Sequence, residues 1–235
     1  ALSLSGANPP DVVQTAAAVV TLLDDETLNQ PPGFPDTEVD PLLGVEGNVF
    51  SIVRQADGRY LLAGEFVRVN DEPRNRIARI NADGSLDTTF SSKESTAGAN
   101  DSVLSMLCQT DGRILIGGQF SYVNGTARNY LARLMANGML DSSFNPGAGP
   151  ESTVLAMAET FVDGSRRLLV GGAFATFNGL GRNFLVRLTE AGAVDPSFNP
   201  SLSPNGPVHC IVMDGEGRAL IGGDFTMVNG IQRMH

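Results

Sequence analysis

Apolar residues along the chain form short runs, and residues that favour tight turns bound each run. In the stretch from Val49 to Phe90, two runs rich in β-branched and aliphatic side chains flank Asp57-Gly58. Such runs predict β-strands, and an Asp-Gly pair predicts a hairpin because glycine readily adopts positive φ. The predicted strands are 49–55, 59–66, 76–81 and 85–90, with a second turn at Asp83-Gly84 and a polar loop carrying Asn70 and Arg74.

The same pattern recurs about four times, in copies that start near Val49, Val103, Val154 and Val208. A glycine with a phenylalanine two residues later marks each copy: Gly64 and Phe66, Gly118 and Phe120, Gly172 and Phe174, Gly223 and Phe225. The glycines are 54, 54 and 51 residues apart. Because glycine has no side chain, we expect close backbone approach or a bulge at these positions. The phenylalanines are expected in the core.

Four short antiparallel strands in a unit of this length are typical of a β-propeller blade. We therefore predict an all-β fold in which residues 39–235 form propeller repeats, and an open β-solenoid of stacked sheets is the alternative. Residues 1–38 do not fit the repeat and are expected to be an extended or capping segment. Val39-Asp40-Pro41-Leu42-Leu43 resembles the fourth strand of a unit, and the last copy is incomplete. We expect either a piece of a longer repeat protein or closure against another chain.

Charged residues also recur in register, as an arginine in the third strand and an aspartate eight residues later. They are Arg79, Arg133 and Arg187, followed by Asp87, Asp141 and Asp195. Two functions are conceivable for such a set: a ring of ligand contacts, or a charge pair that closes each hairpin between strands three and four. A feature present in every copy is normally one that the unit needs to fold, so we favour the charge pair.

Composition narrows the range of partners. The net charge is −10, which disfavours nucleic acid and anionic membrane surfaces. No apolar run approaches the ~20 residues that a membrane-spanning helix needs, so membrane insertion is not expected. The two cysteines, Cys108 and Cys210, lie at different registers of the repeat, so we expect two buried thiols in strands and no disulfide between them.

Residues that could carry chemistry are few. The chain has two histidines and no C-x-x-C pair, so no metal site is predicted. No G-x-S-x-G elbow and no G-x-x-x-x-G-K loop is present, so we predict no catalytic residues and no cofactor. His209 stands where other copies have Phe50, Leu104 and Leu155, and we expect a hydrogen-bonded histidine near an interface between blades. The absence of tryptophan weakens a glycan-binding function.

Several stretches resemble the delta-60 repeat, a bacterial repeat of β-propeller type. The stretches that carry the resemblance are QTDGRILIGGQF, ARNYLARL and ANGMLDSSFNPG, and similar ones extend over about residues 39–235. The resemblance implies a secreted or surface-attached bacterial protein, and it implies no established catalytic site.

We therefore expect a non-catalytic structural or interaction scaffold that contacts other protein chains, either a partner or a second copy. An adhesin or glycan-binding propeller is the first alternative. A propeller hydrolase or lyase, with residues such as His209 converging at a central channel, is the second.

Overall fold

Each of the first three repeats folds into its own three-stranded antiparallel sheet. The described part of the fourth repeat forms a separate sheet of two strands. The computed structural model describes residues 44–91, 97–198 and 203–233. Sheet 1 holds β2 (Val49–Arg54), β3 (Tyr60–Gly64) and β6 (Ile77–Ile80); sheet 2 holds β7 (Val103–Cys108), β8 (Ile114–Gly118) and β11 (Leu131–Leu134). Sheet 3 holds β12 (Val154–Val162), β13 (Ser165–Gly172) and β16 (Leu185–Thr189), and sheet 4 holds β17 (Val208–Met213) and β18 (Ala219–Gly223). The described residues contain no helix, as predicted.

The segment predicted as a fourth strand is shorter than expected. In each of the first three copies, a single antiparallel β-bridge joins it to the third strand. The bridges are Ile80–Leu86, Leu134–Leu140 and Leu188–Val194. Directly after the bridge, the aspartate side chain forms a turn: Asp87 Oδ1 accepts hydrogen bonds from the backbone N–H and the hydroxyl of Thr89. This side-chain turn competes with strand pairing and ends it. The short strand predicted over 85–90 is for this reason reduced to one bridge.

The predicted polar loop after the second strand is also more ordered than expected. It forms a small hairpin in every repeat: β4 (Arg68–Val69) with β5 (Glu72–Pro73), β9 (Tyr122–Val123) with β10 (Thr126–Ala127), β14 (Thr176–Phe177) with β15 (Leu180–Gly181), and β19 (Met227–Val228) with β20 (Ile231–Gln232). β1 (Val45–Glu46) pairs with β4. Asn124 and Gly125 have φ of 48° and 72°, as a two-residue hairpin turn requires.

The recurring glycine lies opposite a β-bulge in the first strand of each repeat. In sheet 2 the register shifts between Val103 and Ser105, and the same shift occurs in the other three sheets. A Cβ atom on Gly118 would lie 2.1 Å from the carbonyl oxygen of Ser102. Gly64, Gly172 and Gly223 meet the equivalent carbonyl at 2.0–2.2 Å. The predicted close approach and bulge are thus confirmed.

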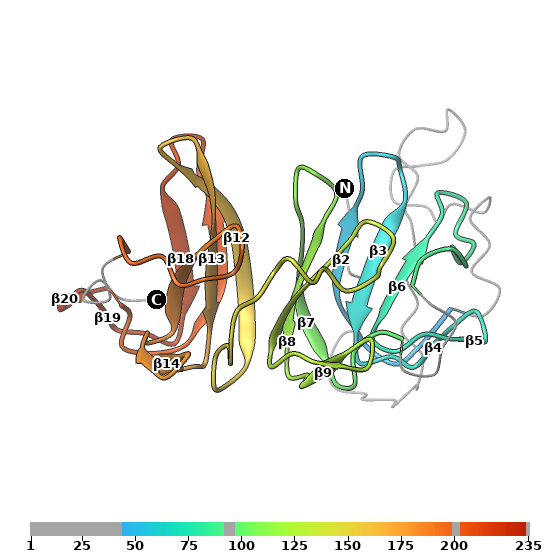
Figure 1. Cartoon of the computed structure of the whole chain (residues 1–235), viewed down its shortest axis with the longest axis horizontal. Helices are drawn as coiled ribbons and strands as arrows, with labels where there is room; N and C mark the ends of the chain where they lie inside the picture. Colours follow the sequence, from blue (N-terminus) through green and yellow to red (C-terminus); the bar gives the residue numbers. More distant parts are fainter. Residues whose placement is uncertain (1–43, 92–96, 199–202, 234–235) are drawn as a thin grey trace, which may run out of the picture.

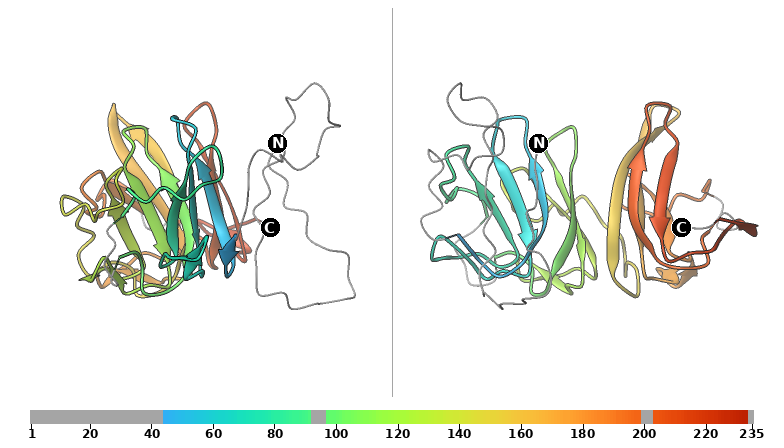
Figure 2. Two further views of the ribbon diagram at one scale, coloured as in Figure 1. Left: turned by 90° about the vertical axis from the view of Figure 1, so that its right-hand side faces the viewer. Right: turned by 180° about the vertical axis from the view of Figure 1, so that it is seen from behind.

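The sheets pack face to face in chain order. β7 contacts β2, β12 contacts β7, and β17 contacts β12, and sheets 1 and 4 lie at opposite ends of the row (Figure 1). Figure 2 shows the same order from behind. Sheets approach closely at the glycine before the recurring one, because a Cβ on Gly117 would lie 2.4 Å from Val154 Cγ1 of the next sheet.

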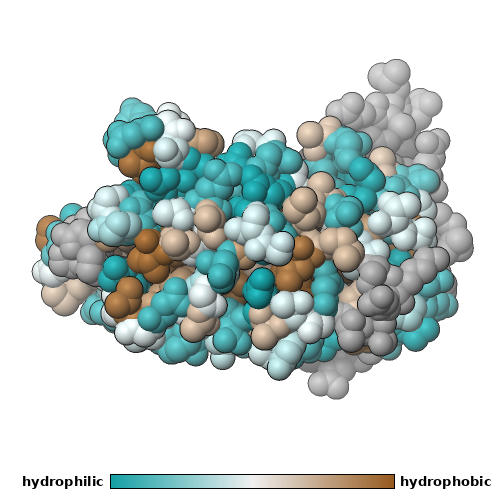
Figure 3. All heavy atoms as spheres, viewed as in Figure 1, coloured by the Kyte–Doolittle hydropathy of each residue, from teal (hydrophilic) through white to brown (hydrophobic). Residues whose placement is uncertain are grey.

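Hydrophobic cores fill the spaces between the sheets. The predicted core phenylalanines Phe66, Phe120, Phe174 and Phe225 are all buried, which confirms that prediction. The face seen in Figure 3 is mostly hydrophilic, with hydrophobic residues in small separate groups. The predictions for residues 1–38, and for the fourth-strand match at 39–43, lie outside the described residues.

Candidate functional site

The recurring arginine and aspartate form an ion pair inside each of the first three repeats. Arg79 Nε donates to Asp87 Oδ2 at 2.8 Å and Arg133 Nε donates to Asp141 Oδ2 at 2.7 Å. The third pair joins Arg187 Nε to Asp195 Oδ2 at 2.9 Å. All three aspartates are buried. The interpretation as a charge pair across the hairpin is confirmed in all three copies.

These aspartates ionise more readily than an ordinary aspartate. Burial alone would raise the pKa of Asp195, but hydrogen bonds from Ser197, Arg167 and Arg187 outweigh it and lower the pKa to about 2. The pKa of Asp87 falls well below its usual range, because hydrogen bonds from Thr89 and Arg79 outweigh the effect of burial in the same way. The pairs therefore remain charged at neutral pH and hold the turn after the bridge in place.

A second arginine also reaches each aspartate, and the sequence analysis missed it. Arg59 Nη1 lies 2.8 Å from Asp87 Oδ2 and Arg167 Nε lies 3.0 Å from Asp195 Oδ2. The signal was present, because this arginine follows the turn before the second strand in every copy. In the fourth copy Arg218 pairs instead with Asp214 at 2.6 Å and with Glu216 at 2.9 Å.

The third-strand arginine also connects one repeat to the next. Arg79 Nη1 donates to the carbonyl oxygen of Ala136 at 2.7 Å, and Arg133 Nη1 donates to that of Glu190 at 2.6 Å. Both acceptors lie in the turn after the third strand of the following repeat. For Arg187, the described residues supply no such carbonyl. Its side chain is 17% exposed, against 6% for Arg79 and 1% for Arg133.

An aromatic ring lies beneath each of these guanidinium groups. The distance from Cζ to the ring centroid is 4.7 Å for Arg79 on Phe90, 4.9 Å for Arg133 on Phe144 and 5.0 Å for Arg187 on Phe198. Phe90 and Phe144 are buried, as predicted, whereas Phe198 is only partly buried. The arginine is therefore held by a carboxylate, a ring and, in the first two repeats, a carbonyl oxygen of the neighbouring repeat.

His209 lies at the bulge of β17, where its side chain is half exposed. Its Nε2 atom is 2.7 Å from Oδ2 of Asp224, which is itself exposed. The hydrogen bond is as predicted. Cys108 and Cys210 are free thiols in β7 and β17, as predicted, but the predicted burial was wrong: Cys108 is only partly buried and Cys210, beside the bulge of an outer sheet, is exposed. Within the described ranges, no group of three histidine, cysteine or acidic side chains is placed to hold a metal ion.

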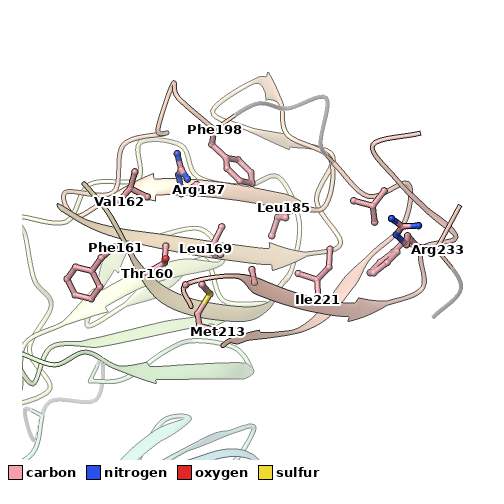
Figure 4. Close-up of a pocket in the computed structure, with 14 residues that line it drawn as sticks. Thr160, Phe161, Val162, Leu169, Leu185, Arg187, Phe198, Met213, Ile221 and Arg233 are labelled. Atoms are coloured by element: carbon pink, nitrogen blue, oxygen red, sulfur yellow. The ribbon is translucent and has the colours of Figure 1, made fainter. Parts of the chain in front are cut away.

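The most distinctive feature outside the repeated pairs is a cleft between sheets 3 and 4. Its volume is about 570 Å³. Apolar side chains of both sheets form most of its lining, among them Leu169, Leu185, Phe198, Met213 and Ile221 (Figure 4). Arg187 lines the cleft on one side and Arg233 on the other. Such a lining suits an apolar segment that also carries hydrogen-bond acceptors.

One side of this cleft is bounded by a strand edge that has no neighbour among the described residues. In sheets 1 to 3 the second strand lies between the first and the third, so both of its edges are paired. In sheet 4, β18 pairs with β17 alone within the described part of the chain. We also find no helix in the described residues that is long and apolar enough to cross a membrane.

Comparison with known proteins finds one family model that matches part of each of the first three repeats. Residues 55–90, 109–144 and 164–198 match the model of a β-propeller domain of unknown function (DUF5122). A search of curated proteins gave no match. Each matched stretch runs from near the first turn of a repeat to the phenylalanine beneath the arginine, so it includes both arginines and the shared aspartate. Three stretches of the chain, one in each of the first three repeats, are therefore similar to a β-propeller repeat whose function is unknown.

Proposed function

We propose that this protein is a non-catalytic interaction scaffold that contacts other protein chains. The observation that carries the proposal is the cleft between sheets 3 and 4, with its largely apolar lining and an arginine on either side. A second feature supports it. The arginines and aspartates that recur in the repeats are engaged with one another, so they serve the stacking of the sheets.

Site-specific photocrosslinking in the producing cells tests this function. Phe161 lies at the rim of the cleft and is 57% exposed, so a photoreactive benzoyl-phenylalanine fits there without disturbing the core. The matched control places the same residue at Tyr122, which is also exposed but lies in another repeat. We expect a discrete crosslinked protein from position 161 and none from position 122. No protein product at 161, or equal products at both positions, would overturn the proposal.

We also propose that each repeat is a delta-60-type propeller blade whose fourth strand is reduced to one bridge. The DUF5122 match, the three-stranded sheets and their face-to-face packing in chain order support this assignment. A crystal structure of the native protein tests it: we expect the sheets to radiate from a common axis, and a straight stack would refute it.

By its resemblance to delta-60 repeats, the protein is proposed to be bacterial and to function in the cell envelope or outside the cell. Cell fractionation tests this localisation, and recovery in the cytoplasmic fraction alone would contradict it.

A further inference from the structure

We propose that a pocket between the first and the second repeat binds a small molecule that carries a carboxylate on a ring. This binding site goes beyond the interaction function proposed above, and it is separate from the cleft between sheets 3 and 4. The volume of the pocket is about 450 Å³, which suits a small ligand. Two departures from the repeat, at Arg76 and at Asn100, give the pocket a chemistry of its own.

Residues of both repeats, and of the segment that connects them, line this pocket. In the connecting segment, Gly98 forms a β-bridge with Asn75 of repeat 1, and Ala99 forms one with Val123 of repeat 2. The sheets of both repeats have all three strands. The backbone around the pocket is therefore held by pairing on both sides.

The first departure is Arg76, which stands where the next two repeats have an aromatic residue. Arg76, Tyr130 and Phe184 share one backbone position: their φ angles are 66°, 60° and 62°. In each copy the N–H of this residue donates to the carbonyl of the recurring phenylalanine, at 3.0, 2.8 and 2.7 Å. Tyr130 packs against the core between sheets 2 and 3, and Phe184 against the core between sheets 3 and 4. The first repeat therefore places a cation where the others place a ring, so the repeat does not need this arginine to fold.

The guanidinium of Arg76 lacks a counter-charge among the described residues. Arg59 and Arg79 of the same repeat both pair with a carboxylate, and Arg74 donates Nη1 to the carbonyl of Pro73 at 2.7 Å. The Nε atom of Arg76 is buried and has no hydrogen-bond acceptor in that part of the chain. A buried donor without an acceptor is rare in folded proteins because it costs free energy. A carboxylate in the pocket would supply both the acceptor and the counter-charge.

The second departure removes a negative charge from the same pocket. Asn100 Oδ1 accepts hydrogen bonds from the N–H groups of Ser121 and Tyr122, each at 2.9 Å. Between repeats 2 and 3 the carboxylate of Glu151 accepts the two equivalent bonds. Asparagine thus does the same backbone task without a charge that would compete for Arg76. Among the described residues, no acidic side chain lines the pocket.

Tyr122 adds the second property of the ligand. Its side chain lines the pocket and is 50% exposed, and the hydrogen bond from its N–H to Asn100 fixes its backbone. The equivalent residues in the later repeats are Thr176 and Met227, so this ring also belongs to the one pocket. An exposed aromatic face favours contact with another flat or apolar ring surface. The ligand is therefore a carboxylate on a ring, either an acidic sugar or an aromatic acid.

An NMR titration of the ¹⁵N-labelled whole chain tests the site. The probes are sodium D-glucuronate and sodium benzoate at constant ionic strength, each beside a neutral counterpart, D-glucose or benzyl alcohol. We expect at least one acid to shift the amide signals of Arg76, Gly98 and Tyr122 saturably, and its neutral counterpart to bind at least about tenfold more weakly. Glucuronate alone would identify an acidic sugar, and benzoate alone an aromatic acid. Saturation by neither acid, or equal binding of acid and neutral counterpart, refutes the inference.

The repeat itself supplies variants that keep the fold. Arg76→Tyr copies the second repeat and should weaken binding about 10- to 100-fold, because a charge-assisted hydrogen bond is lost. Asn100→Glu copies the next connecting segment, keeps the bonds to the hairpin, and should weaken binding because its carboxylate competes for Arg76. Arg74→Ala is the matched control: it removes a neighbouring arginine that does not line the pocket, so binding should be unchanged. The dispersion of each spectrum verifies that the variant is folded.

Undiminished binding by both Arg76→Tyr and Asn100→Glu would overturn the site. An equal loss in Arg74→Ala would do the same, because it would mean that the acid responds to overall charge. The outcome is separable from the scaffold function, since crosslinking from Phe161 reports on the cleft between sheets 3 and 4.

Discussion

Removing Asp141 should be among the most damaging single substitutions at a charged residue of this protein. Asp141→Ala leaves the guanidinium of Arg133, which is 1% exposed, with the Glu190 carbonyl and the hydroxyl of Ser143 as hydrogen-bond partners and with no counter-charge. Breaking a buried ion pair by removing one partner costs about 3–5 kcal/mol, because the remaining charge stays desolvated. Against a typical total of about 5–15 kcal/mol for unfolding, that loss is a large fraction.

Removing an aspartate that pairs with a more exposed arginine, in the third and fourth repeats, should destabilise the protein less. Asp195→Ala should cost about 1–3 kcal/mol, because Arg187 is more exposed and water can hydrate the charge that is left. In the fourth repeat Asp214 lies in the first turn and is one of two partners of the exposed Arg218, so Asp214→Ala should have the smallest effect of the three. The expected order of destabilisation is therefore Asp141, then Asp195, then Asp214.

Urea unfolding measures these differences. Circular dichroism and tyrosine fluorescence should give coincident transitions, and the midpoint should fall with an unchanged slope. A further variant isolates the desolvation: Arg133→Met combined with Asp141→Leu should recover most of the loss, since an apolar pair replaces a buried ionic one at little cost. Equal midpoints for Asp141→Ala and Asp195→Ala, or no recovery in the double variant, would refute the reasoning.

Three other predictions address the glycine, the aspartate titration and the thiols. Gly118→Ala should destabilise the protein by at least about 2 kcal/mol, because its Cβ would overlap the carbonyl across the bulge; Gly181→Ala, which meets no atom within 4 Å, should be neutral, and thermal melting compares them. The pKa of Asp195 is lowered to about 2, so its ~2 kcal/mol of stabilisation is complete above pH ~5 and is lost as the pH falls to 2; the difference in urea midpoint between wild type and Asp195→Asn should shrink over that interval, and a constant difference would contradict it. Burial raises the pKa of Cys108, so a maleimide should label exposed Cys210 first, and equal labelling rates would count against this.

The sequence predicts much of this fold because its repeated residues each have one structural task. Gly64 and its counterparts mark a bulge that tolerates no side chain, and Asp-Gly pairs mark the first turns. The small hairpins escaped prediction because two residues a strand are too few to show alternation. The fourth strand was overestimated because the side chain of Asp87 closes a turn where the apolar pattern continues.

The candidate site was harder to predict for a different reason. The contact from Arg79 reaches a backbone carbonyl at Ala136, and any residue can supply a backbone carbonyl, so the acceptor leaves no mark in the sequence. The cleft likewise leaves no mark, because its lining comes from residues far apart in the sequence, such as Leu169 and Ile221.

The hydrogen bond from each third-strand arginine runs in one direction, from a repeat to its successor. Arg79 donates to the carbonyl of Ala136 and Arg133 to that of Glu190, and each acceptor lies 57 residues further along the chain. A ribosome delivers those residues later, so each newly made repeat holds a guanidinium whose last acceptor has not yet been synthesised. A protein shortened after the first or the second repeat would therefore lack the carbonyl that its last third-strand arginine uses in the whole chain.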